Sequence, residues 1–167
     1  MNLRGVIIRL EKSSDFAAIR TVEEAAFPGP AEAQLVDDLR HAGDSVLSLV
    51  AVENTTVIGH AVFSKLKAPF PALALGPVAV LPERQRIGVG TELIRSGIAH
   101  GNAAGWAAVF VLGDPAFYGR FGFNAGDASA FTSPYAGVHF MVLALTRGGL
   151  PMLKGRVEHA AAFAKLG

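Results

Sequence analysis

The sequence contains no cysteine. This absence excludes disulfide bonds, thiolate metal sites and a cysteine nucleophile, and it leaves the redox compartment open. Five histidines are present, but His139, His159 and the others lack the spacing of metal ligands, so we expect no metal site. A Gly-x-Ser-x-Gly nucleophile elbow is missing as well.

Long apolar runs and an excess of one charge are also absent. No run approaches the ~20 apolar residues that a membrane-spanning helix needs. Arg9, Glu11 and Asp15 interrupt the region where a secretory signal would lie. The 15 basic and 14 acidic residues are spread along the chain and give a net charge of +1, which does not indicate a nucleic-acid stripe or a basic membrane patch. We therefore expect a cytoplasmic protein that binds neither nucleic acid nor membrane.

The chain has enough length and apolar content for one buried core. It has 167 residues, of which 51% are hydrophobic, and this suits a single domain. No internal repeat, linker or low-complexity block divides it. We expect one domain over residues 1–167.

Apolar periodicity predicts an alternation of strands and helices. Phe16, Ile19 and Val22 follow at helical spacing after a run of capping residues at 13–15. Two apolar runs on either side of the polar turn 53–56 predict a hairpin. The expected strands are residues 5–10, 47–52, 57–65, 73–81, 106–112 and 138–145, and the expected helices are residues 15–27, 31–41 and 89–104.

A glycine-rich turn joins the strand 73–81 to the helix 89–104. Pro82 ends the strand, because proline cannot donate to a sheet ladder, and Gln85-Arg86-Ile87-Gly88-Val89-Gly90 follows. The first N–H groups of a helix lack partners within the helix, and the helix dipole adds positive potential there. Glycines allow a bulky anion to approach the backbone. The turn predicts a phosphate or pyrophosphate site, with a strand–helix turn that binds nothing as the alternative.

Two common phosphate-binding motifs do not fit this turn. A P-loop needs lysine and then Ser or Thr directly after its second glycine, whereas Thr91-Glu92 follows Gly90. A dinucleotide fingerprint needs a third glycine where Leu93 stands. The anion has to be identified from other features.

The strand before the turn contains Gly76-Pro77 in an otherwise apolar run. Proline inside a central strand predicts a bulge or a local break in the ladder. A broken ladder leaves neighbouring backbone groups free to pair with a ligand.

These segments together carry a family resemblance. The hexad 85–90 resembles the acyl-CoA pyrophosphate loop of GNAT-type N-acetyltransferases, whose pattern is Gln/Arg-x-x-Gly-x-Gly/Ala. The segment 117–123, with Tyr118, Gly122 and Phe123, resembles the tyrosine-containing stretch that follows the next strand in that family. The resemblance is firm over residues 47–123, and the segment 112–123 is similar to a bacterial branch of uncharacterised N-acetyltransferases.

The resemblance implies an α/β (α+β) fold of GNAT type. Such a fold has a mixed, mostly antiparallel sheet flanked by helices, with one splayed parallel strand pair, here expected at residues 75–80 and 109–113. It also implies acetyl-CoA as cosubstrate, with backbone groups of the bulged strand pairing with the pantetheine arm. The implied cofactor-binding residues are Val78, Ala79, Val80, Gln85, Arg86, Ile87, Gly88, Val89, Gly90, Thr91, Asp114 and Tyr118. Arg84 and Arg120 are either further phosphate ligands or solvated surface residues.

The resemblance also assigns a general acid. A phenol can donate a proton to the departing sulfur of CoA, and the family places a tyrosine for that role where Tyr118 stands. The alternative is that Tyr118 packs with Phe117, Phe121 and Phe123 in a small aromatic core.

The general base is left open. Many GNAT enzymes carry a glutamate on the bulged strand, but residues 73–78 contain no carboxylate. Glu32, His60 and Asp114 are the remaining candidates, and each has a structural alternative: a solvated helix-end charge, a packed strand residue and a turn or cap residue, respectively. A water chain or a backbone carbonyl would also serve.

The expected function is transfer of acetyl from acetyl-CoA to a primary amine of a small molecule or peptide. Alternatives are a non-catalytic acyl-CoA-binding module and a protein-lysine acetyltransferase. The acceptor is expected to enter beside residues 27–32 and the loop 131–135. A homodimer is left open, and residues 146–167 receive no role beyond a helix-prone stretch at 160–164.

Overall fold

The computed structural model describes residues 3–166. Its main sheet has the strand order β1-β2-β3-β4-β5-β7, and β9 pairs with β3 off this path. The strands are β1 (Val6–Leu10), β2 (Ser45–Glu53), β3 (Thr56–Lys67), β4 (Ala72–Val80), β5 (Ala108–Leu112), β7 (Phe140–Ala144) and β9 (Glu158–His159). β4 and β5 are parallel, and the other pairs in this sheet are antiparallel. The expected mixed, mostly antiparallel sheet with one parallel pair is confirmed.

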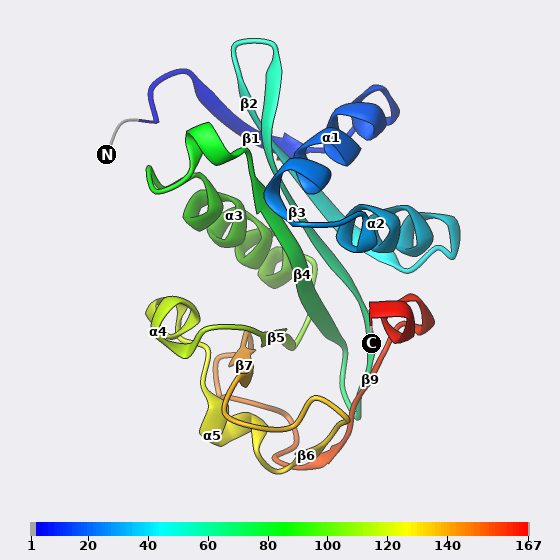
Figure 1. Ribbon diagram of the computed structural model, residues 1–167. Helices are drawn as coiled ribbons and strands as arrows, with labels where there is room; N and C mark the ends of the chain where they lie inside the picture. Colours follow the sequence, from blue (N-terminus) through cyan, green and yellow to red (C-terminus); the bar gives the residue numbers. More distant parts are fainter. Residues whose placement is uncertain (1–2, 167) are drawn as a thin grey trace.

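Helices cover both faces of the sheet (Figure 1). The longer ones are α1 (Phe16–Ala26), α2 (Ala31–His41) and α3 (Val89–Ala103), and α4 (Pro115–Tyr118) and α5 (Ala125–Ala128) are single turns. The 3-10 helices are η1 (Ser13–Asp15), η2 (Pro82–Arg84), η3 (Gly119–Phe121) and η4 (Ala161–Leu166), and β6 (Phe131–Thr132) pairs with β8 (Gly155–Arg156) as a small second sheet. The three long helices agree with the predicted ranges to within two residues at each end.

The two faces follow from strand alternation on β3. Phe63 packs in a cluster with Leu93 and Ile94 of α3, whereas its neighbour Val62 packs in a cluster with residues of α1 and α2. Successive strand side chains point to opposite faces, so one central strand supplies both cores. A third cluster fills the space around β5, β7 and the small sheet.

The segment after β7 differs most from the prediction. Residues 146–167 were given no role, yet β9 pairs Leu66 of β3 with His159, and η4 covers the helix-prone stretch. The Phe163 side chain packs against the α1–α2 cluster. Two-residue strands have no periodicity of their own to detect, so this return to the sheet has no local sequence signal.

Close packing of α3 on the sheet requires glycine at one position. A Cβ added at Gly97 would overlap the ring of Phe63, and Phe63 is fully buried. A Cβ added at Gly101, one turn later on the same helix, would meet Leu145 and Leu73 at 3.5 and 3.6 Å, which is ordinary contact. The two glycines therefore have opposite packing environments.

We predict that Gly97→Ala destabilises the protein by roughly 1–3 kcal/mol, the usual cost of overpacking a core. Gly101→Ala is the matched control and should be neutral or stabilising by up to ~1 kcal/mol, because alanine is the better helix former. Urea unfolding of both variants measures this difference. Equal stability changes for the two substitutions would show that α3 does not approach β3 as closely as described.

Candidate active site

The turn between β4 and α3 presents free backbone donors. Gly88, at the N-cap of α3, has a φ of 100°, in the left-handed region that favours glycine. Arg86 is also left-handed, with φ 68°, which is uncommon for a non-glycine residue. The Gln85 amide donates to the Val80 carbonyl at 3.0 Å, so this side chain ties the turn to the end of β4. The first N–H groups of α3 are left facing outward from the sheet's end.

The basic side chains near this turn divide into two sets. Arg120 Nη2 donates to Thr91 Oγ1 at 3.1 Å, so η3 brings a guanidinium to the first turn of α3. Arg84 instead pairs with Glu53, Nε to Oε1 at 2.7 Å, on the β2–β3 hairpin. The geometry thus favours Arg120 over Arg84 as a partner for an anion at the helix end.

β4 and β5 part in the middle of the sheet. Their parallel pairing runs from Ala72–Ala108 to Leu75–Val111 and ends there. On the other side of β4, the register with β3 shifts between the pairs Ala61–Val78 and Phe63–Leu75, which places an extra residue on β4 at Gly76-Pro77. The predicted bulge and splay are both confirmed, and the β4 edge beyond Leu75 has no pairing with β5.

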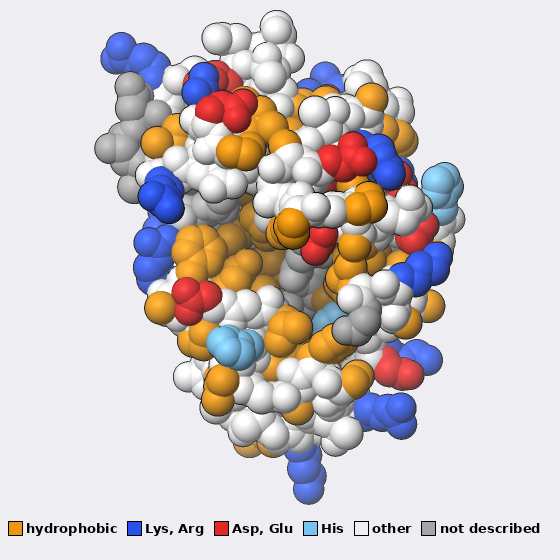
Figure 2. All heavy atoms as spheres, in the orientation of Figure 1, with side chains coloured by type: hydrophobic (Ala, Val, Ile, Leu, Met, Phe, Trp, Pro, Cys, Tyr) orange, Lys and Arg blue, Asp and Glu red, His pale blue; other side chains and the backbone are white. Residues whose placement is uncertain are grey.

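A cavity of about 520 Å³ opens beside this splay. Figure 2 shows a hollow in this face with hydrophobic side chains gathered around it. The volume is in the range of small-molecule sites. The lining residues come from five places: α1–α2 (Phe27, Ala31, Glu32, Leu35), the β4 bulge (Leu75, Gly76, Pro77, Val78), β5 and α4 (Leu112, Tyr118), the loop before β7 (Tyr135), and the C-terminal segment (His159, Phe163, Leu166).

Tyr118 enters this cavity from α4. Asp114 caps that helical turn by accepting from the Ala116 N–H at 3.0 Å, which is the cap role considered for it. The Tyr118 ring lies against the backbone of Gly113, where a Cβ would overlap it. It also packs edge-on to Phe117 and Phe123, at 5.0 and 5.7 Å between ring centroids.

The aromatic packing and the acid role are compatible in Tyr118. Burial raises the pKa of its hydroxyl above the usual value, because the surroundings disfavour the phenolate. A tyrosine hydroxyl is protonated at neutral pH in any case, and burial moves its pKa further from that range, so the group is a hydrogen-bond donor at the cavity wall.

The three candidate bases have different positions. Glu32 lines the cavity, whereas Asp114 is occupied as a helix cap. His60 does not line the cavity: it is fully buried, with Nδ1 at 2.7 Å from Glu23 Oε2 and Nε2 at 2.8 Å from Ser48 Oγ. His60 is therefore a packed strand residue between β3 and α1, which was the structural alternative to its role as a base.

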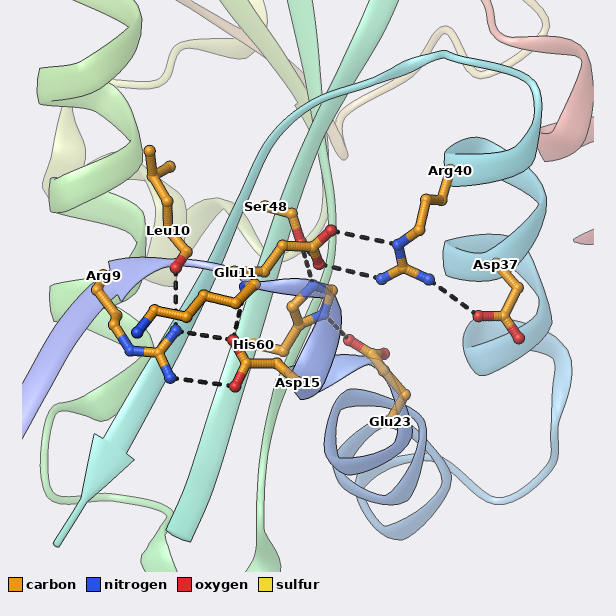
Figure 3. A network of polar contacts seen from close by, with 10 residues as sticks. Arg9, Leu10, Glu11, Asp15, Glu23, Asp37, Arg40, Ser48 and His60 are labelled. Carbon is orange, nitrogen blue, oxygen red and sulfur yellow. Dashed lines mark hydrogen bonds and ion pairs between the residues drawn. The ribbon is translucent and has the colours of Figure 1, made fainter. Parts of the chain in front are cut away.

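His60 belongs to a chain of polar contacts that runs from the interior toward the surface (Figure 3). Ser48 Oγ donates to Glu11 Oε1 at 2.5 Å, and Glu11 accepts two hydrogen bonds from Arg40 at 3.0 and 3.2 Å. Burial raises the pKa of Glu23, which opposes the lowering by His60. The network ties α1 and α2 to the sheet beside the cavity. Glu23 stood on an otherwise apolar helix face in the sequence, and that was the one signal of its burial.

His159 is the cavity residue that sequence reasoning missed. Burial lowers the pKa of its imidazole to about 4, and its Nδ1 is buried without a hydrogen-bond partner among the described residues. Its ring contacts Tyr135 and Phe163 at 4.8 and 5.1 Å between centroids. A neutral imidazole is therefore part of the cavity lining, together with Tyr118.

Two features are absent from the part of the chain that the structure describes. Within residues 3–166, no group of three or more His, Cys, Asp or Glu side chains is arranged to hold a metal ion. Over the same range, no helix has the length and apolar content needed to cross a membrane.

Comparison with known proteins gives consistent matches. The model of the acetyltransferase (GNAT) family matches residues 16–123. The uncharacterized N-acetyltransferase YjhQ of Escherichia coli (strain K12) is 37% identical over 145 residues, covering 81% of this chain and 79% of YjhQ. The uncharacterized N-acetyltransferase YhbS of the same strain is 34% identical over 160 residues, covering 92% of this chain and 96% of YhbS.

Solved structures match over nearly the whole chain. The crystal structure of YhbS from Escherichia coli in complex with CoA has a TM-score of 0.91 at 33% identity, covering 97% of this chain and 93% of that one. A GNAT family acetyltransferase from Brucella melitensis in complex with acetyl-CoA has a TM-score of 0.81 at 39% identity, covering 95% and 97%.

The depressed pKa of His159 predicts a pH dependence of stability. The unfolded chain binds a proton at His159 below the ordinary value of 6.5, whereas the folded chain binds it only near 4. This residue therefore lowers the free energy of unfolding as the pH falls from 6.5 to 4. As the pH falls from 6.5 to 4, the free energy of unfolding of His159→Gln should therefore rise by roughly 1–3 kcal/mol relative to that of the parent.

The measurement is urea unfolding at several pH values, read as the difference between variant and parent. Taking the difference cancels the contributions of other titrating groups. One of these is Glu23, whose raised pKa makes the folded protein more stable as the pH falls. Asn102→Ala, an exposed position without a titratable side chain near the end of α3, is the control and should give a flat difference. A flat difference for His159→Gln as well would contradict the burial described here.

Proposed function

Because the chain belongs to the acetyltransferase (GNAT) family and is therefore an N-acetyltransferase that uses acetyl-CoA, we propose that it moves the acetyl group to a primary amine of a small molecule or peptide in this cavity. One structural arrangement is the main support for this proposal. The β4 bulge, Leu112 at the end of β5 and Tyr118 line the same cavity, and β4 leads from that bulge to the glycine turn at the N-terminus of α3.

The proposal gives CoA an extended path along the splay. Its pyrophosphate lies on the turn 85–91, where the α3 N–H groups and Arg120 carry positive potential. Its pantetheine arm lies along the unpaired β4 edge at residues 78–80. The Val80 carbonyl already accepts from Gln85, so the remaining backbone groups of that stretch are the available partners. The related structures that contain CoA and acetyl-CoA support this path.

The chemistry then follows from alignment. The amine nitrogen attacks the thioester carbonyl carbon, the carbon–sulfur bond breaks, the nitrogen loses a proton and the sulfur gains one. Tyr118 donates its hydroxyl proton to the departing sulfur as that sulfur develops charge. Holding the two reactants in register supplies much of the remaining rate.

Among the three candidates for accepting the amine proton, we retain Glu32, directly or through water. It lies on the α2 side of the cavity, whereas His60 and Asp114 are engaged elsewhere. Because Glu32 is on a helix and not on the bulged strand, the base in this proposal comes from a different element from the strand glutamate of many GNAT enzymes.

Acetyl-CoA should stabilise the protein, by about 2.7 kcal/mol at a concentration 100 times its Kd. Gly90→Val should weaken this stabilisation strongly while leaving the unliganded protein folded. A Cβ at Gly90 meets only Val80, at 3.8 Å, so the side chain projects where the phosphates are proposed to lie. Thermal melting with and without acetyl-CoA measures both effects.

Gly88 is the less informative position, because its φ of 100° would strain a substituted backbone even without ligand. If Gly90→Val and the parent gain the same stability from acetyl-CoA, the phosphates do not lie on this turn. If neither gains any at millimolar acetyl-CoA, the CoA site itself is refuted.

Tyr118→Phe should lower kcat by about 10²–10⁴ at saturating acetyl-CoA, the usual contribution of a general acid. Affinity for CoA and melting temperature should change little, since the ring contacts remain. Gly113→Ala should also lower kcat, because the added methyl displaces the Tyr118 ring.

Steady-state release of CoA with an accepted amine tests both variants. A kcat within about twofold of the parent in Tyr118→Phe, with chemistry rate-limiting, would remove this residue from the mechanism. Stabilisation by acetyl-CoA without transfer to any amine would identify a non-catalytic CoA-binding module instead.

A further inference from the structure

The acceptor side of the cavity is apolar and carries one carboxylate. Away from the β4 bulge and Tyr118, its walls come from the α1–α2 junction, the end of β5, the loop before β7 and the C-terminal segment. The apolar and aromatic contributors are Phe27, Ala31, Leu35, Leu112, Tyr135, Phe163 and Leu166, and the remaining members are Glu32 and His159. No lysine or arginine is among the lining residues described.

The charge state of this cavity follows from its burial. His159 is neutral near pH 7 because burial lowers its pKa to about 4, and Tyr118 is neutral because the pKa of its phenol, ordinarily 10.0, is raised further by burial. Glu32 is thus the single side chain on the described lining that brings a full charge. A negative group in an otherwise apolar wall favours one cation and disfavours a ligand carboxylate, which would find no cationic partner.

We propose that the acceptor is a monoamine with an apolar body and no carboxylate, whose ammonium group is held by Glu32 and whose body packs on Phe163 and Leu166. This deepens the proposed function and rests on it. Polyamines and aminoglycosides do not fit, since their additional ammonium groups would lie against apolar walls without counter-charges. Free amino acids do not fit either, since their carboxylate would be repelled by Glu32.

Two features support a specific role for the C-terminal segment. β9 anchors it to the sheet through the Leu66–His159 pair, and Phe163 packs on His159 at 5.1 Å between ring centroids. These contacts hold the ring of Phe163 in the cavity wall. The body of the amine would then meet a preformed apolar surface.

The activity test is a panel of amines with the parent enzyme and acetyl-CoA. From propylamine to hexylamine, kcat/KM should rise about fourfold for each added methylene, the ratio that corresponds to ~0.8 kcal/mol. 2-Phenylethylamine should be accepted, and spermidine, free lysine and a lysyl peptide should be poor acceptors. A preference for any of these three over hexylamine would overturn the proposal and leave acetyl transfer intact.

The binding test does not depend on turnover. Titration calorimetry of hexylamine into the CoA-bound protein gives its Kd directly. Glu32→Gln should raise that Kd about 10- to 100-fold, in line with loss of a charge-assisted hydrogen bond. Glu32→Asp should recover part of the affinity, and Glu24→Gln, an exposed carboxylate on α1, should leave it unchanged. A purely proton-accepting Glu32 would lower kcat without changing this Kd, and that outcome would refute the anchoring role.

A second variant tests the apolar wall. Phe163→Ala should flatten the dependence on chain length, with propylamine little affected and hexylamine losing most of its advantage. Leu166→Ala, whose side chain is partly exposed at 41%, gives the same test if Phe163→Ala fails to fold. Binding of hexylamine without acetyl transfer would support the amine site while refuting the proposed reaction. An unchanged chain-length dependence in a folded variant would refute the amine site.

Discussion

The parting of β4 from β5 is the constraint on which the rest of the site depends. Gly76-Pro77 adds a residue to β4 and ends the parallel ladder at Leu75–Val111. An antiparallel or parallel neighbour would otherwise occupy that edge and leave no backbone free. The bulge residues also line the cavity that Tyr118 and Glu32 border. One interruption in the sheet thus accompanies both the unpaired β4 edge proposed to bind CoA and the cavity proposed for the reaction.

The polar interior beside the cavity gives its walls a fixed frame. Glu23 and His60 pair at 2.7 Å in full burial, and Ser48, Glu11 and Arg40 continue the chain of contacts to α2. Buried polar groups are costly unless they find partners, so these pairings select one docking of α1 and α2 on the sheet. The residues at the α1–α2 junction that line the cavity take their positions from that docking.

The sequence predicted those features that depend on neighbouring residues. Proline and glycine predicted the bulge and the turn, because each permits or forbids particular backbone angles, and apolar periodicity predicted the three long helices. Contacts between segments that are distant in the sequence could not be predicted. His60 appeared as a reactive histidine because nothing in its own strand revealed Glu23 and Ser48, and His159 appeared isolated because its neighbours arrive only when β9 joins β3. The tertiary placement of an imidazole, and not its presence, decides its role.

The positions of the cavity residues in the sequence also determine the order in which they are synthesised. The cofactor turn, the bulge and Tyr118 lie within residues 76–118, whereas β9 and η4 come after residue 157. Synthesis proceeds from the N-terminus, so the ribosome delivers a complete cofactor turn well before the segment that closes the opposite wall. Until β9 pairs with the end of β3, the apolar side chains of the α1–α2 junction lack the cover of Phe163. The wall that we propose to recognise the acceptor is therefore completed by the part of the chain that is synthesised last, whereas the proposed cosubstrate site is encoded entirely before it.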